Sequence, residues 1–69
     1  MEKVLYYVEP QDDFKAEGRY FYKGEKYPVL EKENDKDFVV LTAENGAFNF
    51  KNTLMDQVIS EWELKTHSI

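Results

Sequence analysis

The side chains that could support acid–base or metal chemistry are scattered along this 69-residue chain. His67 is the only histidine, and there is no cysteine with which it could complete a zinc site. Asp12 with Asp13, and Asp35 with Asp37, are paired acids that lack the glycine and distal glutamate of a calcium loop. The three glycines are isolated from one another, so no phosphate-binding loop is predicted. We therefore expect no catalytic residue, no metal, no cofactor and no enzymatic activity.

The segment from residue 19 to residue 27 has the composition that best suits binding. Three tyrosines alternate there with basic side chains: Tyr20, Tyr22 and Tyr27 with Arg19, Lys23 and Lys26. The ordinary interpretation of such a stripe is core packing with tyrosines at the rim. Tyrosine also suits protein interfaces, because its ring is apolar and its hydroxyl tolerates water. The same rings beside basic groups could instead stack on single-stranded bases.

Acidic residues dominate the charge of the chain. Fourteen Asp and Glu against nine Lys and Arg give a formal net charge of −5 at pH 7. This charge repels nucleic-acid phosphates, so a protein partner ranks above nucleic acid. Four acids early in the chain form either a solvated surface or a mimic of nucleic acid that occupies a basic cleft: Glu9, Asp12, Asp13 and Glu17. The predicted partner-binding residues are Tyr7, Asp12, Asp13, Phe14, Glu17, Tyr20 and Tyr22.

The length and composition predict one small folded domain. A chain this short buries only about 60% of the surface that it exposes when unfolded. Its 42% hydrophobic and 16% aromatic content is nevertheless that of a folded protein. The lack of cysteine fits a reducing compartment. Met1 is followed by Glu2 rather than by a basic and then an apolar segment, so we expect a cytoplasmic protein that does not enter a membrane.

The first third of the chain predicts a strand, a long loop and a turn. Lys3 to Glu9 is rich in β-branched and aromatic residues and stops at Pro10, which is typical of a strand. Residues 11–18 are polar and acidic, and we expect a loop there that Phe14 pins to the domain. Gly24 is predicted to be the pivot of a turn and to have positive φ.

The strand after Gly24 is predicted to alternate between two environments. Tyr27 and Val29 should face the core, whereas Lys26, Pro28 and Leu30 should face the other way. Pro28 cannot donate a ladder hydrogen bond, so it should lie at an edge, a bulge or a strand start.

The later segments predict a meander and then a more ambiguous end. Residues 34–37 form a turn signal, and strands are expected at residues 38–43 and 47–50 around a hairpin turn. We favour a short helical turn from Thr53 to Val58, with Thr53 as the cap, followed by a closing strand. A helix that continues to Lys65 is the alternative, because the apolar spacing also fits it. Residues 66–69 are expected to form a frayed tail.

Several short motifs resemble those of SH3 domains. The segment "VLYYVEP" resembles their "ALYDY" opening, "YKGEKYPVLEKENDKD" resembles their diverging turn and following loop, and "ENGAFNFKN" resembles their distal hairpin. The chain is still more similar to the small stand-alone SH3-like proteins of phages and Gram-positive bacteria. This resemblance implies a mainly β fold, a five-stranded SH3-like barrel over residues 1–65 with one short helical turn before the last strand.

The resemblance also bears on function. Peptide-binding SH3 domains line a polyproline groove with paired tryptophans, where this chain has Phe38 and Val39. Tyr7 could supply part of one groove wall, but the opposite wall is missing, so polyproline recognition is not expected. The resemblance instead implies a non-enzymatic protein-interaction module. It would be a phage-encoded adaptor or inhibitor that acts on a host protein in the bacterial cytoplasm. A single-stranded nucleic-acid-binding small barrel is the alternative.

Overall fold

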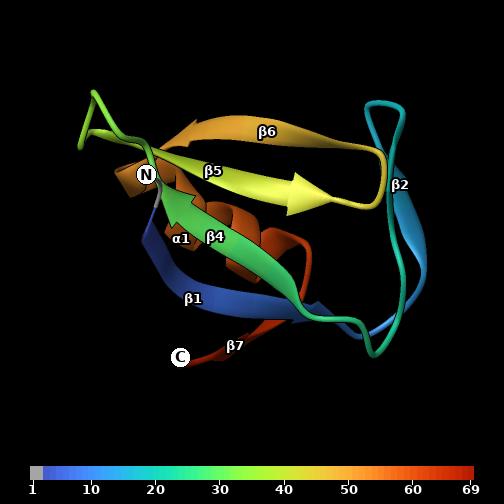
Figure 1. Ribbon diagram of the computed structural model, residues 1–69. Coiled ribbons are helices and arrows are strands. Elements are labelled where there is room, and N and C mark those ends of the chain that lie inside the picture. The colour runs from blue at the N-terminus through green and yellow to red at the C-terminus, as the bar shows by residue number, and fades with distance from the viewer. Residues whose placement is uncertain (1–2) are drawn as a thin grey trace.

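The computed structural model describes residues 3–69 and is mainly β, with one helix in that range. A five-stranded antiparallel sheet has the order β6-β5-β4-β1-β7, and β2 and β3 form a separate hairpin (Figure 1). The elements are β1 (Lys3–Pro10), β2 (Phe14–Ala16), β3 (Arg19–Phe21), β4 (Tyr27–Glu31), β5 (Phe38–Ala43), β6 (Gly46–Lys51), α1 (Asn52–Glu61) and β7 (Leu64–His67). No helix in residues 3–69 combines the length and the apolar character needed to cross a membrane.

The sheet pairs the first strand of the described chain with the last. β4, β5 and β6 form a meander, β1 pairs with the free side of β4, and β7 pairs with β1. The helix α1 links one edge strand, β6, to the other, β7, and contacts both of them (Figure 1). The hairpin of β2 and β3 lies beside the turn between β5 and β6 (Figure 1).

One core fills the space between the sheet, the helix and the hairpin. Because side chains alternate along a strand, every second residue of β5 is buried while its neighbours are partly exposed. Phe21 brings the hairpin into this core, and Met55 and Val58 bring in the helix. The buried hydrophobic residues are Val8, Phe21, Tyr27, Val29, Val39, Leu41, Ala43, Phe48, Met55, Val58 and Leu64.

The turn and strand predicted around Gly24 are confirmed. Gly24 has a φ of 84°, and Tyr27 and Val29 are 4% and 0% exposed. Pro28 is the second residue of β4 and pairs with Tyr7 of β1, whereas the pairing of β4 with β5 begins only at Val29. The missing N–H of Pro28 therefore lies in a part of β4 that pairs on one side only.

The loop predicted for residues 11–18 is wrong in part. Phe14–Ala16 pairs with Arg19–Phe21 as a hairpin, and its two turn residues, Glu17 and Gly18, have φ values of 47° and 80°. A two-residue turn with positive φ at both positions matches the twist of the strands that it joins. Phe14 does pin this segment, since its ring stacks on Phe21 with the centroids 5.0 Å apart.

The helix is longer than the single turn that we predicted, yet it ends well before Lys65. α1 runs for ten residues to Glu61, and Trp62 is its C-cap. The polar–apolar alternation of residues 60–65 therefore does not indicate a strand over its first part, which belongs to the helix and its cap. Thr53 is not the cap. The N-cap is Lys51, whose side chain makes no hydrogen bond to the first turn of the helix. The side chain of the first helical residue, Asn52, bonds outside the helix, where its Nδ2 donates to the carbonyl oxygen of Lys36 at 2.5 Å.

The frayed tail predicted for residues 66–69 is wrong at its first two positions. Thr66 and His67 belong to β7 and pair with Val8 and Tyr7 of β1. The interaction between His67 Nε2 and Glu9 Oε1, at 2.7 Å, adds a side-chain link between these strands. The tail is ordered up to His67 because β1 offers it a free edge.

Candidate functional site

The hairpin of β2 and β3 sorts the predicted binding residues onto two faces. Phe14 pairs with Phe21 and Lys15 pairs with Tyr20, so alternation places the phenylalanines inward and Tyr20 outward. Tyr22, two residues after Tyr20, is 44% exposed and Tyr20 is 40% exposed, whereas Phe21 between them is fully buried. We call Tyr20 and Tyr22 the tyrosine pair.

The tyrosine pair forms a flat aromatic surface with a cation beside it. The two rings are nearly parallel, with an interplanar angle of 12° and centroids 6.4 Å apart. The ammonium nitrogen of Lys15 lies 5.5 Å from the centroid of Tyr20, within the range of a cation–π contact. An apolar ring surface bearing hydroxyls and one charge can pack against a protein or stack on a base.

Hydrogen bonds hold the backbone of the tyrosine pair, from the turn between β5 and β6 at Tyr20 and from Tyr27 of β4 at Tyr22. Asn45 Oδ1 accepts from the Tyr20 N–H at 2.9 Å, and the Glu44 N–H donates to the Tyr20 carbonyl at 3.1 Å. The Tyr22 N–H donates to the hydroxyl of Tyr27 at 2.7 Å, and that hydroxyl donates to Glu44 Oε2 at 2.8 Å. Burial, opposed by the Tyr22 N–H and reinforced by the Glu44 carboxylate, raises the pKa of Tyr27 to about 12.

An aromatic cluster anchors the inner face of the hairpin. Trp62 meets Phe14 edge to face with the centroids 5.5 Å apart, and it contacts Phe21 at 5.8 Å. The guanidinium of Arg19 lies over Phe48, with its carbon 4.9 Å from the ring centroid. The hairpin is thus fixed on both sides, by rings within and by hydrogen bonds to the neighbouring turn.

The three predicted acids of this region have different roles. Asp13 Oδ1 accepts a 2.7 Å hydrogen bond from the Lys23 N–H, so this carboxylate fixes the chain after β3. Glu17 lies in the hairpin turn, where its backbone carbonyl accepts from Arg19 Nη1 at 3.2 Å. Asp12 is exposed and lines a surface hollow. Of the three, Asp12 alone lines that hollow, so the structure does not bring them together in one site.

Tyr7 is not part of the hairpin surface. It lies in β1 of the five-stranded sheet, between its partners Pro28 in β4 and His67 in β7. Its neighbour Val8 is buried, so Tyr7 faces the opposite side of the sheet, where it is partly exposed.

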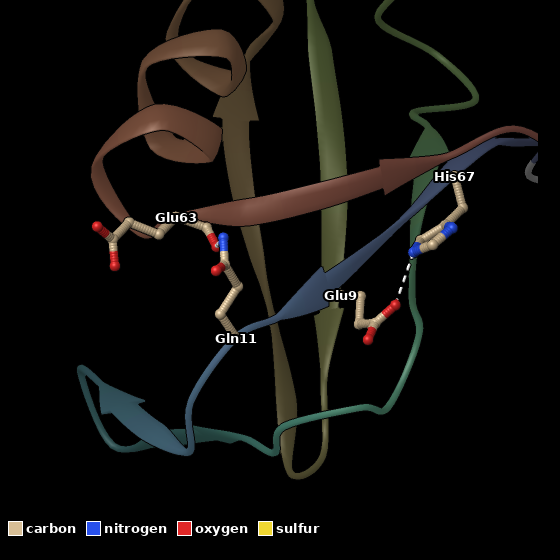
Figure 2. Close-up of polar contacts among 4 residues, drawn as sticks. All are labelled: Glu9, Gln11, Glu63 and His67. Atoms are coloured by element: carbon tan, nitrogen blue, oxygen red, sulfur yellow. Dashed lines mark hydrogen bonds and ion pairs between the residues drawn. The ribbon is translucent and has the colours of Figure 1, made fainter.

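Sequence reasoning missed the hollow beside Asp12. It has a volume of about 260 Å³, and we call it the Trp62 hollow; it is lined by Gln11, Asp12, Phe14, Glu61, Trp62 and Glu63. Two of the lining residues are joined directly: Figure 2 shows the amide of Gln11 next to the backbone of Glu63, and Gln11 Nε2 donates to that carbonyl at 3.0 Å. These two residues are 52 positions apart, and no local pattern announces their contact.

Comparisons of the chain with protein-family models, with curated proteins and with solved structures found no match. The site is therefore interpreted from its own geometry.

Proposed function

We propose that the protein is a non-enzymatic protein-interaction module and that the tyrosine pair is the centre of its binding surface. The observation that carries this proposal is the exposure of two large rings, one in β3 and one directly after it, while the residue between them, Phe21, is fully buried. Tyrosines are common at the centres of protein interfaces because they bury a large area with few rotatable bonds.

The anchoring of the hairpin favours binding without rearrangement. Both the Tyr20 N–H and its carbonyl are bonded to the β5–β6 turn, and Phe14 and Phe21 pack in the aromatic cluster. A surface that is already ordered loses less conformational entropy when a partner binds.

The proposed architecture for this module is an SH3-like small barrel. The adjacency of the first and last strands, a hairpin after the first strand and a helix before the last all support this assignment. The resemblance of its sequence motifs to small SH3-like proteins of phages is the basis for proposing a phage-encoded adaptor or inhibitor that acts on a host protein in the cytoplasm.

Affinity capture with matched variants tests the proposal. The wild-type protein should retain a defined partner from a host extract, and the double substitution Tyr20→Ser and Tyr22→Ser should release it. Leu54→Ser is the control. Leu54 lies on α1 and is 46% exposed, so this substitution also removes an exposed apolar side chain, but away from the tyrosine pair. Retention that is equal in all three proteins would show that the tyrosine pair is not the binding surface.

A single-stranded nucleic acid binder is the second candidate. The parallel rings of the tyrosine pair and the ammonium of Lys15 over Tyr20 are the observations that favour it. Binding of a labelled single-stranded oligonucleotide should then weaken steeply with salt and fall after Tyr22→Ala. The net charge of −5 counts against this candidate, and the lack of any mobility shift at low salt would remove it.

A further inference from the structure

The Trp62 hollow has two aromatic walls. Trp62 and Phe14 are half-buried rings whose planes meet at 65°, with the centroids 5.5 Å apart, so they form a corner rather than a flat surface. The remaining contacts of Trp62 with the core rings hold this corner in place. A volume of about 260 Å³ is below that of most small-molecule pockets but accommodates one long side chain.

The rim of the hollow is acidic, and none of the described residues that line it is basic. Asp12, Glu61 and Glu63 are exposed, and within residues 3–69 none of the three carboxylates forms an ion pair with a basic side chain. The Glu61 carboxylate accepts a hydrogen bond from an amide, Gln57 Nε2, at 3.1 Å. Gathering like charges is unfavourable, and a cation in the hollow would relieve the repulsion.

Glu63, which lines the hollow, also has an unfavourable backbone conformation. Glu63 follows the C-cap of α1 and has a φ of 53°, a conformation that favours glycine at this position of a helix end. A glutamate there costs stability that a glycine would not cost. Its carboxylate lies at the end of the helix and points away from the sheet (Figure 2).

We propose that the Trp62 hollow binds an arginine side chain of the partner protein. The flat guanidinium can stack on an indole face while its N–H groups reach carboxylates on several sides, which an ammonium group does less well. This inference rests on the proposed interaction function and identifies the chemistry of the partner segment. Phe14, which lines the hollow, and Tyr20 lie on opposite faces of the hairpin, so the two surfaces can be tested separately.

Trp62 is the only tryptophan of the chain, so its fluorescence reports directly on the hollow. The probe is a blocked peptide, Gly-Ser-Arg-Gly-Arg-Ser-Gly, compared with the same peptide in which citrulline replaces each arginine. We expect the arginine peptide to produce a saturable change in Trp62 emission, and the neutral citrulline peptide to bind about tenfold more weakly or not at all.

Variants assign the binding to the hollow. The double substitution Glu61→Gln and Glu63→Gln should weaken the arginine peptide about tenfold. Glu31→Gln is the matched control, because Glu31 lies at the far end of the β1–β4 pairing, and it should change binding less than about twofold. Glu63→Gly should keep or raise the urea midpoint of unfolding while weakening the peptide, which separates binding from folding.

Equal binding of the citrulline peptide would overturn the inference, as would unchanged binding by the double variant or a folded Glu63→Gly variant that binds as the parent does. Millimolar calcium chloride that alone reproduces the emission change would also overturn it, in favour of a metal site. If the arginine peptide fails while capture still depends on Tyr20 and Tyr22, only this inference falls and the proposed function stands.

Discussion

At the scale of single residues, Tyr27 couples the core to the proposed binding surface. Its ring is 4% exposed and meets Phe21 edge to face, while its hydroxyl bonds the backbone of Tyr22 and the carboxylate of Glu44. The position of the chain after β3 therefore depends on the protonated form of Tyr27. A phenolate could not donate a hydrogen bond to Glu44 and would lie beside the negative charge of its carboxylate.

The raised pKa of Tyr27 predicts a loss of stability in alkali. A phenol with a folded-state pKa of about 12 and an unfolded value of 10.0 binds its proton more tightly in the folded protein. Its contribution is fully present below pH 10.0 and is lost as the pH rises toward about 12. We expect the free energy of unfolding, measured by urea denaturation, to fall by about 2 to 3 kcal/mol over this range because of Tyr27.

Tyr27→Phe is the control for this pH dependence. It removes the titrating group, so its stability should fall less steeply with pH, although it should be less stable than the parent near neutrality. The pKa of Tyr6 is also raised, by burial and by Asp56, and Tyr6 should contribute equally to the pH dependence of both proteins. Parallel pH profiles for parent and variant would show that Tyr27 titrates normally.

At the scale of elements, the connection between β3 and β4 depends on one backbone conformation. Gly24 has a φ of 84°, and its N–H donates to the carbonyl of Pro10 at 3.4 Å. A β-carbon added at this position would meet no atom within 4 Å, so the cost of a substitution comes from backbone strain rather than from a clash of the β-carbon.

Gly24→Val should therefore destabilise the protein by about 1 to 3 kcal/mol, because a β-branched residue resists positive φ. Gly24→Asn should cost less than Gly24→Val, since asparagine adopts the left-handed region more readily. Urea midpoints for the parent and both variants measure the difference. If the valine variant were as stable as the parent, the left-handed conformation at residue 24 would not be required.

At the scale of the whole molecule, local patterns predicted the strands better than they predicted the contacts between distant segments. The strand Phe38–Ala43 was predicted with its observed bounds, because its composition and the flanking turns are local signals. The hairpin after β1 was missed because Glu17, rather than glycine or asparagine, adopts the first positive φ of its turn.

The remaining differences come from tertiary packing. The helix extends past Val58 because Met55 and Val58 pack on the core, which overrides the local strand-like alternation near Trp62. The tyrosine pair was predicted from its residue types, whereas the Trp62 hollow could not be. Its walls come from the β1–β2 connection and the end of α1, which only the folded chain brings together.

The pairing of the first and last strands gives a final prediction, since it assigns a structural role to residues expected to fray. A chain that ends after Lys65 loses the pairs of Thr66 with Val8 and of His67 with Tyr7, together with the contact between His67 and Glu9. We expect this truncation to lower the free energy of unfolding by about 1 to 3 kcal/mol, a large fraction of the stability of so small a domain. Removing only residues 68 and 69, which lie beyond β7, is the control and should change it by less than about 0.5 kcal/mol. Equal urea midpoints for the two truncated proteins would mean that the second half of β7 contributes nothing, and that only Leu64 and Lys65 of this edge strand stabilise the sheet.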